Sequence, residues 1–155
     1  IFACGCFWGA QYQFEHAKGV VRSTVGYIGG HKEHPAYEEV KAHTTGHAEA
    51  TLVEFDAEQT SFTELCKLFF EIHDPAQTDG QGPDIGPQYR SEIFYLNDKQ
   101  KEEAEAVIAL LRRKGYEVNT KLTPATTFWE GEEYHQHYYD KTGGEPYCHI
   151  RVKKF

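Results

Sequence analysis

Apolar residues change their spacing several times along this chain of 155 residues, and each change predicts a switch between strand and helix. The short apolar run 1–3 and the β-branched run 20–28 are typical of strands. Between them, apolar residues recur at intervals of three to four over 7–17, which predicts a helix ended by Lys18-Gly19. A strand therefore passes directly into a helix near residue 5, and this junction organises the N-terminal part of the fold.

The rest of the chain continues the alternation. Ser61, followed three residues later by Glu64, forms a capping box that predicts the start of a helix. The inward positions of the longest helix, capped by Asn97 or Asp98, are Ala104, Val107, Ile108 and Leu111. The expected elements are a helical turn at 35–41, a strand at 48–55, helix 61–73, strand 91–96, helix 98–114, an edge strand 118–128 broken near Pro124, and a short helix 132–139.

Helices placed between strands in this mixed order predict an α+β fold. We expect a two-layer sandwich with a mixed sheet and a ferredoxin-like core. The chain has no internal repeat or long linker, so we expect one domain over residues 1–155. Residues 142–155 contain Gly143, Gly144 and Pro146 and are expected to form a loop tail.

Charge and hydropathy exclude two classes of partner. The net charge of −8 and the pI near 5.6 argue against nucleic acid, and we interpret the basic triplet 112–114 as a solvated helix end. No apolar run approaches the roughly 18 residues of a membrane span. We expect a monomer in the cytoplasm. The sequence begins at Ile1 and not at Met, so it does not decide whether a targeting segment was lost from the N-terminus.

Four cysteines are too few for a disulfide-stapled secreted domain, so thiols in a reducing compartment are expected. Cys6 lies at the predicted strand-to-helix junction, where unpaired N–H groups and the helix dipole favour the nucleophilic thiolate. The alternative is that Cys6 is a small buried apolar residue. The neighbouring rings of Phe7 and Trp8 could wall a pocket for a small apolar group such as a methyl, which favours the functional interpretation.

Glu49 is a carboxylate inside a strand of otherwise apolar and small residues. If buried, it would have a raised pKa and could donate a proton near neutral pH. The alternatives are an outward-facing side chain or a salt bridge. The Gly- and Pro-rich loop 80–91, with Asp84 and Tyr89, is either functional or a plain solvated turn, and Tyr37 is either functional or part of the core.

A metal site is not expected. Cys4 and Cys6, together with His135 and His137, offer suitable ligand types, but zinc ligands are usually separated by at least two residues. We expect the histidine pair to decorate the last helix.

Taken together, these segments resemble the A-type peptide methionine sulfoxide reductases over nearly the whole chain. Tyr37 agrees with the family pattern in order and spacing. The other matching motifs are Gly-Cys-Phe-Trp-Gly around Cys6, Gly-His-Ala-Glu ending at Glu49, His73-Asp74-Pro75, the stretch from Asp84 to Ser91, and the late segment from Glu132 to Tyr138.

The resemblance implies reduction of the S epimer of methionine sulfoxide, free or in proteins, without a cofactor. The sulfoxide methyl would lie against Phe7 and Trp8, and Cys6 would attack the sulfur and become a sulfenic acid. Glu49 would protonate the oxygen, with hydrogen bonds from the Tyr37 and Tyr89 hydroxyls, while Asp84 would orient a water or a tyrosine. A second thiol would form a disulfide that a thioredoxin-like reductant opens.

The sequence constrains the identity of the resolving thiol less than that of any other site residue. Cys4 stands where the family usually has a small residue without a thiol, and its Cα would lie about 7 Å from that of Cys6 in an extended strand, near the limit for a disulfide. Cys66 lies on an apolar helix stripe and is expected to be inert. Cys148 lies in the loop tail, so we predict a Cys6–Cys148 disulfide, with Cys4 as the alternative.

Two other functions are compatible with these residues. A thiol peroxidase would also form a sulfenic acid but would consume hydrogen peroxide rapidly. A module that only binds oxidised peptides would need no reactive Cys6.

Overall fold

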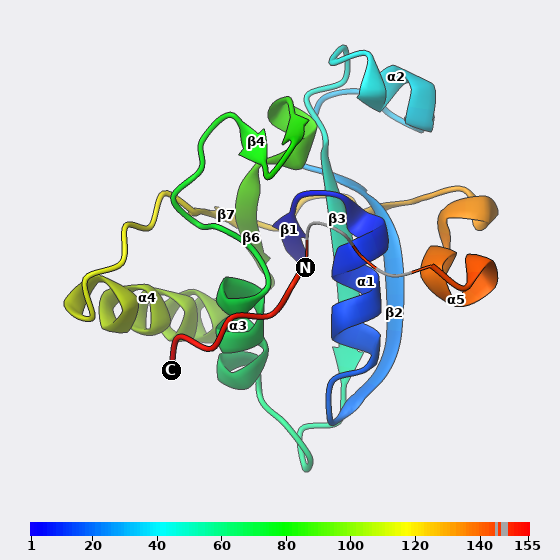
Figure 1. Ribbon diagram of the computed structural model, residues 1–155. Coiled ribbons are helices and arrows are strands. Elements are labelled where there is room, and N and C mark those ends of the chain that lie inside the picture. The colour runs from blue at the N-terminus through cyan, green and yellow to red at the C-terminus, as the bar shows by residue number, and fades with distance from the viewer. Residues whose placement is uncertain (145, 147–148) are drawn as a thin grey trace.

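A six-stranded sheet forms the centre of the computed structural model, which describes residues 1–144, 146 and 149–155 (Figure 1). The strand order is β7-β6-β1-β3-β2-β8. The strands are β1 (Phe2–Cys4), β2 (Val20–Ile28), β3 (Ala48–Phe55), β6 (Ser91–Tyr95), β7 (Lys121–Pro124) and β8 (Trp129–Glu130). A separate two-stranded ribbon pairs β4 (Gly80–Gln81) with β5 (Asp84–Ile85).

The helices begin where the sequence signals predict them. Ser61 accepts a hydrogen bond from the Glu64 N–H, and Asn97 accepts one from the Gln100 N–H. Each side chain therefore satisfies a backbone donor that the first helical turn leaves unpaired. The helices are α1 (Phe7–Glu15), α2 (Tyr37–Lys41), α3 (Phe62–Glu71), α4 (Asp98–Arg113) and α5 (Tyr138–Thr142), with single 3₁₀ turns at Pro87–Tyr89 and Glu133–His135.

The predicted α+β sandwich has the ferredoxin-like core that we expected. Strands β1, β2, β3 and β6 alternate with α1 and α3, and they lie in the sheet order β6-β1-β3-β2 with every neighbouring pair antiparallel. The outer strand β7 then adds to β6 in the parallel direction, which makes the sheet mixed. In this order β1 is central, so the turn that follows it into α1 emerges from the middle of the molecule (Figure 1).

An aromatic cluster holds α1 and α3 on one face of the sheet. Phe2 of β1 stacks on Phe14 of α1 at 4.9 Å between ring centroids and lies 5.3 Å from Phe69 of α3. The four predicted inward residues of α4 are buried, in the same cluster. The opposite face of the sheet is covered in part by Ala125 and Phe128. Both pack against a cluster of buried residues that includes Ala48 and Phe94.

Two predicted elements are wrong in their extent. The expected strand 118–128 is only β7, because residues 125–128 leave that edge to pack on the sheet, and β8 pairs with β2 at the opposite edge. The expected helix 132–139 is interrupted at Gln136 and His137. The Gln136 side chain bonds both the N–H and the carbonyl of Val25 on β2, and His137 is left-handed with φ 55°.

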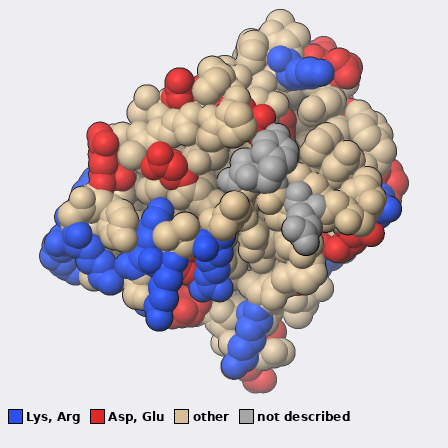
Figure 2. Space-filling model, in the orientation of Figure 1, with Lys and Arg blue, Asp and Glu red and all other residues tan. Residues whose placement is uncertain are grey.

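Figure 2 shows lysine and arginine side chains gathered at the lower left, where Figure 1 places the end of α4 and the C-terminal tail. Arg112 and Arg113 lie in the last turn of α4, where cations complement the helix dipole. Within the described residues, no helix is long and apolar enough to cross a membrane.

We predict that Phe14→Ala lowers the free energy of unfolding by about 3–5 kcal/mol, because it removes a buried ring and leaves a cavity under α1. Urea denaturation measures this loss. Leu96→Ala, at a side chain that is 61% exposed, is the control and should change stability by less than about 0.5 kcal/mol. Equal effects of the two substitutions would contradict the assigned core.

Candidate active site

The turn between β1 and α1 places Cys6 at the start of a helix, as predicted. Gly5 has φ 98°, a left-handed conformation that glycine adopts without strain. Cys6 is the N-cap residue of α1, its carbonyl accepts the Ala10 N–H, and its side chain is buried. The thiol therefore lies where the first N–H groups of the helix and its dipole stabilise a negative charge.

Glu49 of β3 is buried, with 2% of its surface exposed, and its carboxyl reaches the same helix terminus. Its Oε1 atom accepts a hydrogen bond of 3.2 Å from the backbone N–H of Phe7, the residue next to Cys6. Burial raises the pKa of Glu49 to about 8, and the charge of Asp84 adds to the rise, while the Phe7 N–H opposes it. At neutral pH most Glu49 side chains therefore hold a proton beside the thiol.

Two tyrosine hydroxyls lie in the same electrostatic environment. Burial, together with the charges of Glu49 and Cys6, raises the pKa of Tyr37 to about 12. The pKa of Tyr89 is raised by burial and by the charges of Glu49, Tyr37 and Asp84. Both hydroxyls are thus protonated donors, and the structure brings all five residues singled out as catalytic into one site. Asp84 lies in the ribbon, opposite Gln81.

Arg90 joins two segments that carry site residues. Its guanidinium donates to the Pro87 carbonyl at 2.9 Å, in the 3₁₀ turn that contains Tyr89, and to the Gly46 carbonyl at 3.1 Å, just before β3. Its Nε donates to Glu92 at 2.7 Å. The bonds to Pro87 and Gly46 hold the loop that carries Tyr89 against the turn that precedes Glu49, and the bond to Glu92 fixes the orientation of the guanidinium.

Aromatic rings line the site next to Cys6. Phe7 is buried, and its ring centroid lies 5.7 Å from that of Tyr27 and 6.5 Å from that of Tyr37. Trp8 is half-buried and stacks on Tyr138 of α5 at 3.8 Å with an interplanar angle of 11°. The stacking fixes the plane of the indole beside the thiol-bearing turn.

His135 contacts a site residue, although the sequence did not predict this contact. The prediction that the histidine pair decorates a helix is wrong for His135, which is fully buried and accepts a hydrogen bond of 2.9 Å from the Trp8 indole N–H at Nδ1. Burial lowers its pKa, so the imidazole stays neutral and able to accept. His135 and Trp8 are 127 positions apart, and no local pattern signals such a contact.

The other described cysteines lie in the hydrophobic core. Cys4 is buried in the cluster that contains Phe2, and Cys66 of α3 is buried in the same cluster, where burial raises the pKa of its thiol. Cys66 therefore lies in the core as predicted, where burial disfavours the reactive thiolate. Within the described part of the chain, these two and Cys6 form no disulfide with one another. Cys148, the predicted resolving cysteine, lies outside the described residues.

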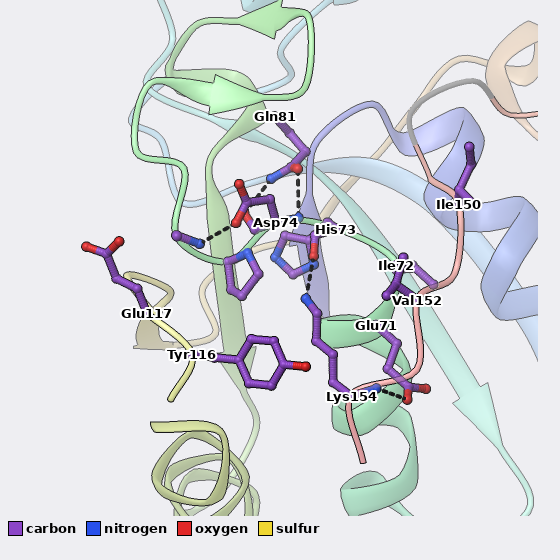
Figure 3. Close-up of a pocket in the computed structure, with 12 residues that line it drawn as sticks. Glu71, Ile72, His73, Asp74, Gln81, Tyr116, Glu117, Ile150, Val152 and Lys154 are labelled. Carbon is purple, nitrogen blue, oxygen red and sulfur yellow. Dashed lines mark hydrogen bonds between the residues drawn. The ribbon is translucent and has the colours of Figure 1, made fainter. Parts of the chain in front are cut away.

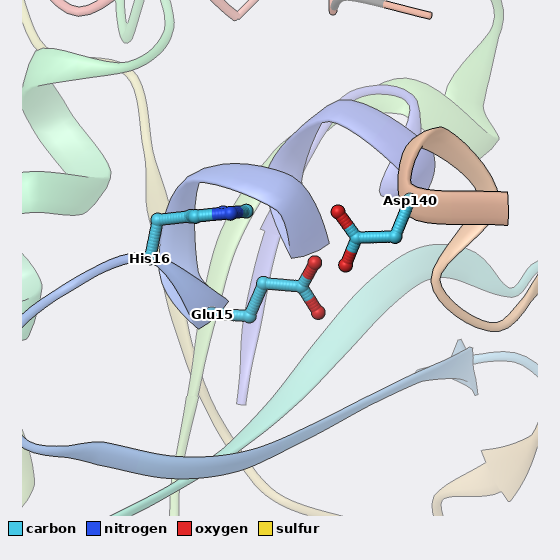
Figure 4. Close-up of side chains that lie close together, drawn as sticks. All are labelled: Glu15, His16 and Asp140. Atoms are coloured by element: carbon cyan, nitrogen blue, oxygen red, sulfur yellow. The ribbon is translucent and has the colours of Figure 1, made fainter. Parts of the chain in front are cut away.

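Among the described residues, the group close enough to hold a cation is not the Cys and His set considered from the sequence. The ligand atoms of Glu15, His16 and Asp140 lie within 4.8 Å of one another (Figure 4). This group is at the C-terminal end of α1, about 13 Å of helix away from Cys6. His137 already bonds Glu15 at 2.6 Å, and two of the three side chains are exposed, so nothing links the group to the thiol site.

Comparisons with known proteins agree over nearly the whole chain. The family model described as peptide methionine sulfoxide reductase matches residues 1–155. The peptide methionine sulfoxide reductase MsrA of Geobacter sulfurreducens is 47% identical over 146 residues, which cover 92% of this chain and 90% of that protein. The reduced form of Mxr1 from Saccharomyces cerevisiae has a TM-score of 0.90 at 34% identity, over 97% of this chain and 89% of that one. Mxr1 has also been solved in complex with Trx2.

The raised pKa of Glu49 predicts how stability depends on pH. Between about 4.5, the ordinary value, and about 8, the folded state holds a proton that the unfolded state has released. Stability from this group therefore falls as the pH rises through that window. We predict that the unfolding free energy of the parent, minus that of Glu49→Gln, decreases from about pH 5 to about pH 8. Urea denaturation across the window measures the difference, and a constant or rising value would contradict the assignment.

Proposed function

The chain belongs to the peptide methionine sulfoxide reductase family, and from this premise we propose that Cys6 is the nucleophile and Glu49 the proton donor in the reduction of methionine sulfoxide. One observation carries the proposal. The helix that presents Cys6 also holds the buried Glu49 carboxyl through the Phe7 N–H. The nucleophile and the protonated acid are therefore held at the same helix terminus. Attack on a sulfoxide requires both groups together.

The first half of the reaction begins with attack of the Cys6 thiolate on the sulfoxide sulfur. A sulfur–sulfur bond forms, the oxygen gains negative charge, and Glu49 donates a proton to it. The hydroxyls of Tyr37 and Tyr89 donate hydrogen bonds to the same oxygen, and Asp84 orients a water or a tyrosine. Transfer of the hydroxyl to Cys6 breaks the new bond, which leaves a sulfenic acid and releases methionine.

Phe7 and Trp8 are proposed to contact the methyl group of the substrate. Trp8 offers a partly exposed ring whose position is fixed by Tyr138 and His135, so it forms a rigid apolar wall. A fixed wall on one side of the sulfur and fixed oxygen donors on the other distinguish the two sulfoxide configurations. We propose that the S epimer is the one accepted, free or in proteins.

Regeneration is proposed to use Cys148. Its thiol attacks the sulfenic sulfur of Cys6, a disulfide forms, and the hydroxyl leaves as water with the thiol proton. The burial of Cys4 in the core supports this choice, because a resolving thiol must reach the site. We propose that a thioredoxin-like dithiol then reduces the disulfide, in line with the Trx2 complex of the yeast relative.

Four broader proposals complete this account. We propose that residues 1–155 form one catalytic domain that acts as a monomer without a metal or bound cofactor. The low number of cysteines supports action in the reducing cytoplasm.

We predict that Cys6→Ser abolishes reduction of a dabsylated methionine sulfoxide in the presence of dithiothreitol, because serine provides no usable anion near neutral pH. Cys66→Ser is the matched control and should keep parent activity, since that thiol is buried in the core. Near-normal turnover by Cys6→Ser would reject the nucleophile. Rapid consumption of hydrogen peroxide with little sulfide product would favour a thiol peroxidase instead.

Glu49→Gln keeps the size of the side chain but removes the proton to be donated. We predict a loss of about 10²–10⁴ in the rate of the first turnover, the usual contribution of a general acid. Glu130→Gln, on β8 and largely exposed, is the control. If Glu49→Gln stays within a few-fold of the parent at every pH, the carboxyl has only a structural role.

Cys148→Ser should convert about one sulfoxide per enzyme and then fail to cycle with thioredoxin, because the sulfenic acid has no resolving partner. Peptide mapping of the oxidised parent should identify a Cys6–Cys148 disulfide. A Cys4–Cys6 disulfide, or normal cycling by Cys148→Ser, would make Cys4 the resolving thiol.

A further inference from the structure

His149 fastens the C-terminal tail to the turn that carries Cys6. Its imidazole is fully buried, and Nε2 lies 2.7 Å from the backbone carbonyl of Cys4. Its own carbonyl accepts a hydrogen bond of 2.5 Å from the Gln13 side chain on α1. One tail residue is thereby bonded to the strand before Cys6 and to the helix after it.

The imidazole lies next to two glycines, and Gly9 is the one that leaves room for it. A methyl group on Gly9 would overlap Nδ1 of His149. A methyl group on Gly5 would clash with the Gln81 side chain and would lie at ordinary contact distance, 3.5 Å, from Nε2 of His149. Cys6 lies between these glycines in the sequence, so the ring fills a notch on the thiol-bearing turn. Burial lowers the pKa of His149, and the neutral ring therefore carries its proton on Nε2, where it donates to Cys4.

A second attachment holds the end of the tail. Glu71, buried at the end of α3, accepts two bonds from the Arg151 guanidinium and one from the Lys154 backbone N–H. The Lys154 ammonium donates to the Phe70 carbonyl in the last turn of α3 and to the His73 carbonyl, two residues beyond the helix. The bond to His73 is drawn in Figure 3. These contacts border a cavity of about 450 Å³ whose lining also includes Gln81 and Tyr116. The contacts of His149 are separate from this attachment and lie against the Cys6 turn.

We propose that His149 is a positioning residue for regeneration, and that its imidazole in the notch between Gly5 and Gly9 fixes the register of the tail for attack by Cys148. Cys148 immediately precedes His149 in the sequence, so a fixed His149 limits the distance between the attacking thiol and Cys6. Restricting two reacting groups in this way raises their effective concentration. The proposal rests on the proposed function, in which Cys148 resolves the Cys6 sulfenic acid.

The experiment separates the two half-reactions in one rapid-quench time course with one equivalent of sulfoxide. Methionine release reports the first half, and loss of two titratable thiols reports the disulfide. For His149→Ala we expect methionine release within about twofold of the parent and disulfide formation slower by about tenfold or more. A dimedone adduct should accumulate on Cys6. His149→Gln, whose amide can donate to the Cys4 carbonyl, should recover part of the rate, and His149→Phe should not.

Gly9→Ala disturbs the same notch from the other side. Its added methyl group displaces the imidazole, so it should also slow disulfide formation while methionine release continues. If both substitutions act through the notch, the double variant Gly9→Ala/His149→Ala should be no slower than His149→Ala alone. Additive losses in the double variant would overturn the shared mechanism.

Three further outcomes test the role of His149 and the identity of the resolving thiol. If Cys148→Ser forms the disulfide normally, the proposed resolving thiol is wrong. If Cys148→Ser forms no disulfide but His149→Ala forms it at the parent rate or faster, Cys148 is the resolving thiol and the positioning role of His149 is rejected. A parallel loss of both half-reactions in His149→Ala, with a lower melting temperature, would show a general structural role and would also reject positioning.

Discussion

The hydrogen bond from the Phe7 N–H to Glu49 is the interaction on which the site depends. It joins the first turn of α1 to the start of β3, so one contact holds the buried carboxyl close to the thiol at the helix N-cap. The ferredoxin-like order makes this contact available, because β1 and β3 are neighbours in the sheet and α1 lies on the face that Glu49 points toward. A change in strand register by one residue would turn Glu49 to the opposite face and separate the two groups.

Burial raises the pKa values of the acidic side chains at the site. It keeps the Glu49 carboxyl protonated at neutral pH, and it raises the pKa values of the half-buried Tyr37 and Tyr89 phenols further above neutrality, so all three side chains are donors. The N-cap position has the opposite effect on Cys6, because helix N–H groups favour an anion there. One nucleophile surrounded by protonated donors is the arrangement that a sulfoxide needs, since the bond to oxygen breaks only when that oxygen gains a proton. Bound substrate would exclude water and strengthen each of these interactions.

Local signals predicted the parts of this arrangement that depend on neighbouring residues. The cap at Ser61, the inward stripe of α4 and the junction at Cys6 follow from spacing and capping chemistry, and family motifs added Tyr37 and Asp84. The missed features all join residues far apart in the chain. His135 contacts Trp8 across 127 positions, and His149 contacts Cys4 across 145. Such polar side chains are buried singly, so they leave no periodic pattern, and their partners are determined only once the sheet has formed.

The most direct test of the account is the pH dependence of the first turnover, measured as the second-order rate constant for methionine release in single-turnover experiments on the Cys148→Ser variant. If Glu49 supplies the proton, the rate should fall as the pH rises through about 8, because the carboxyl is then ionised. The falling limb should disappear in the Glu49→Gln enzyme, whose lower rate should stay level over the same range. A parent rate that stays level or keeps rising beyond about pH 9, or a falling limb that survives in Glu49→Gln, would contradict the claim that a proton held on buried Glu49 drives the reaction.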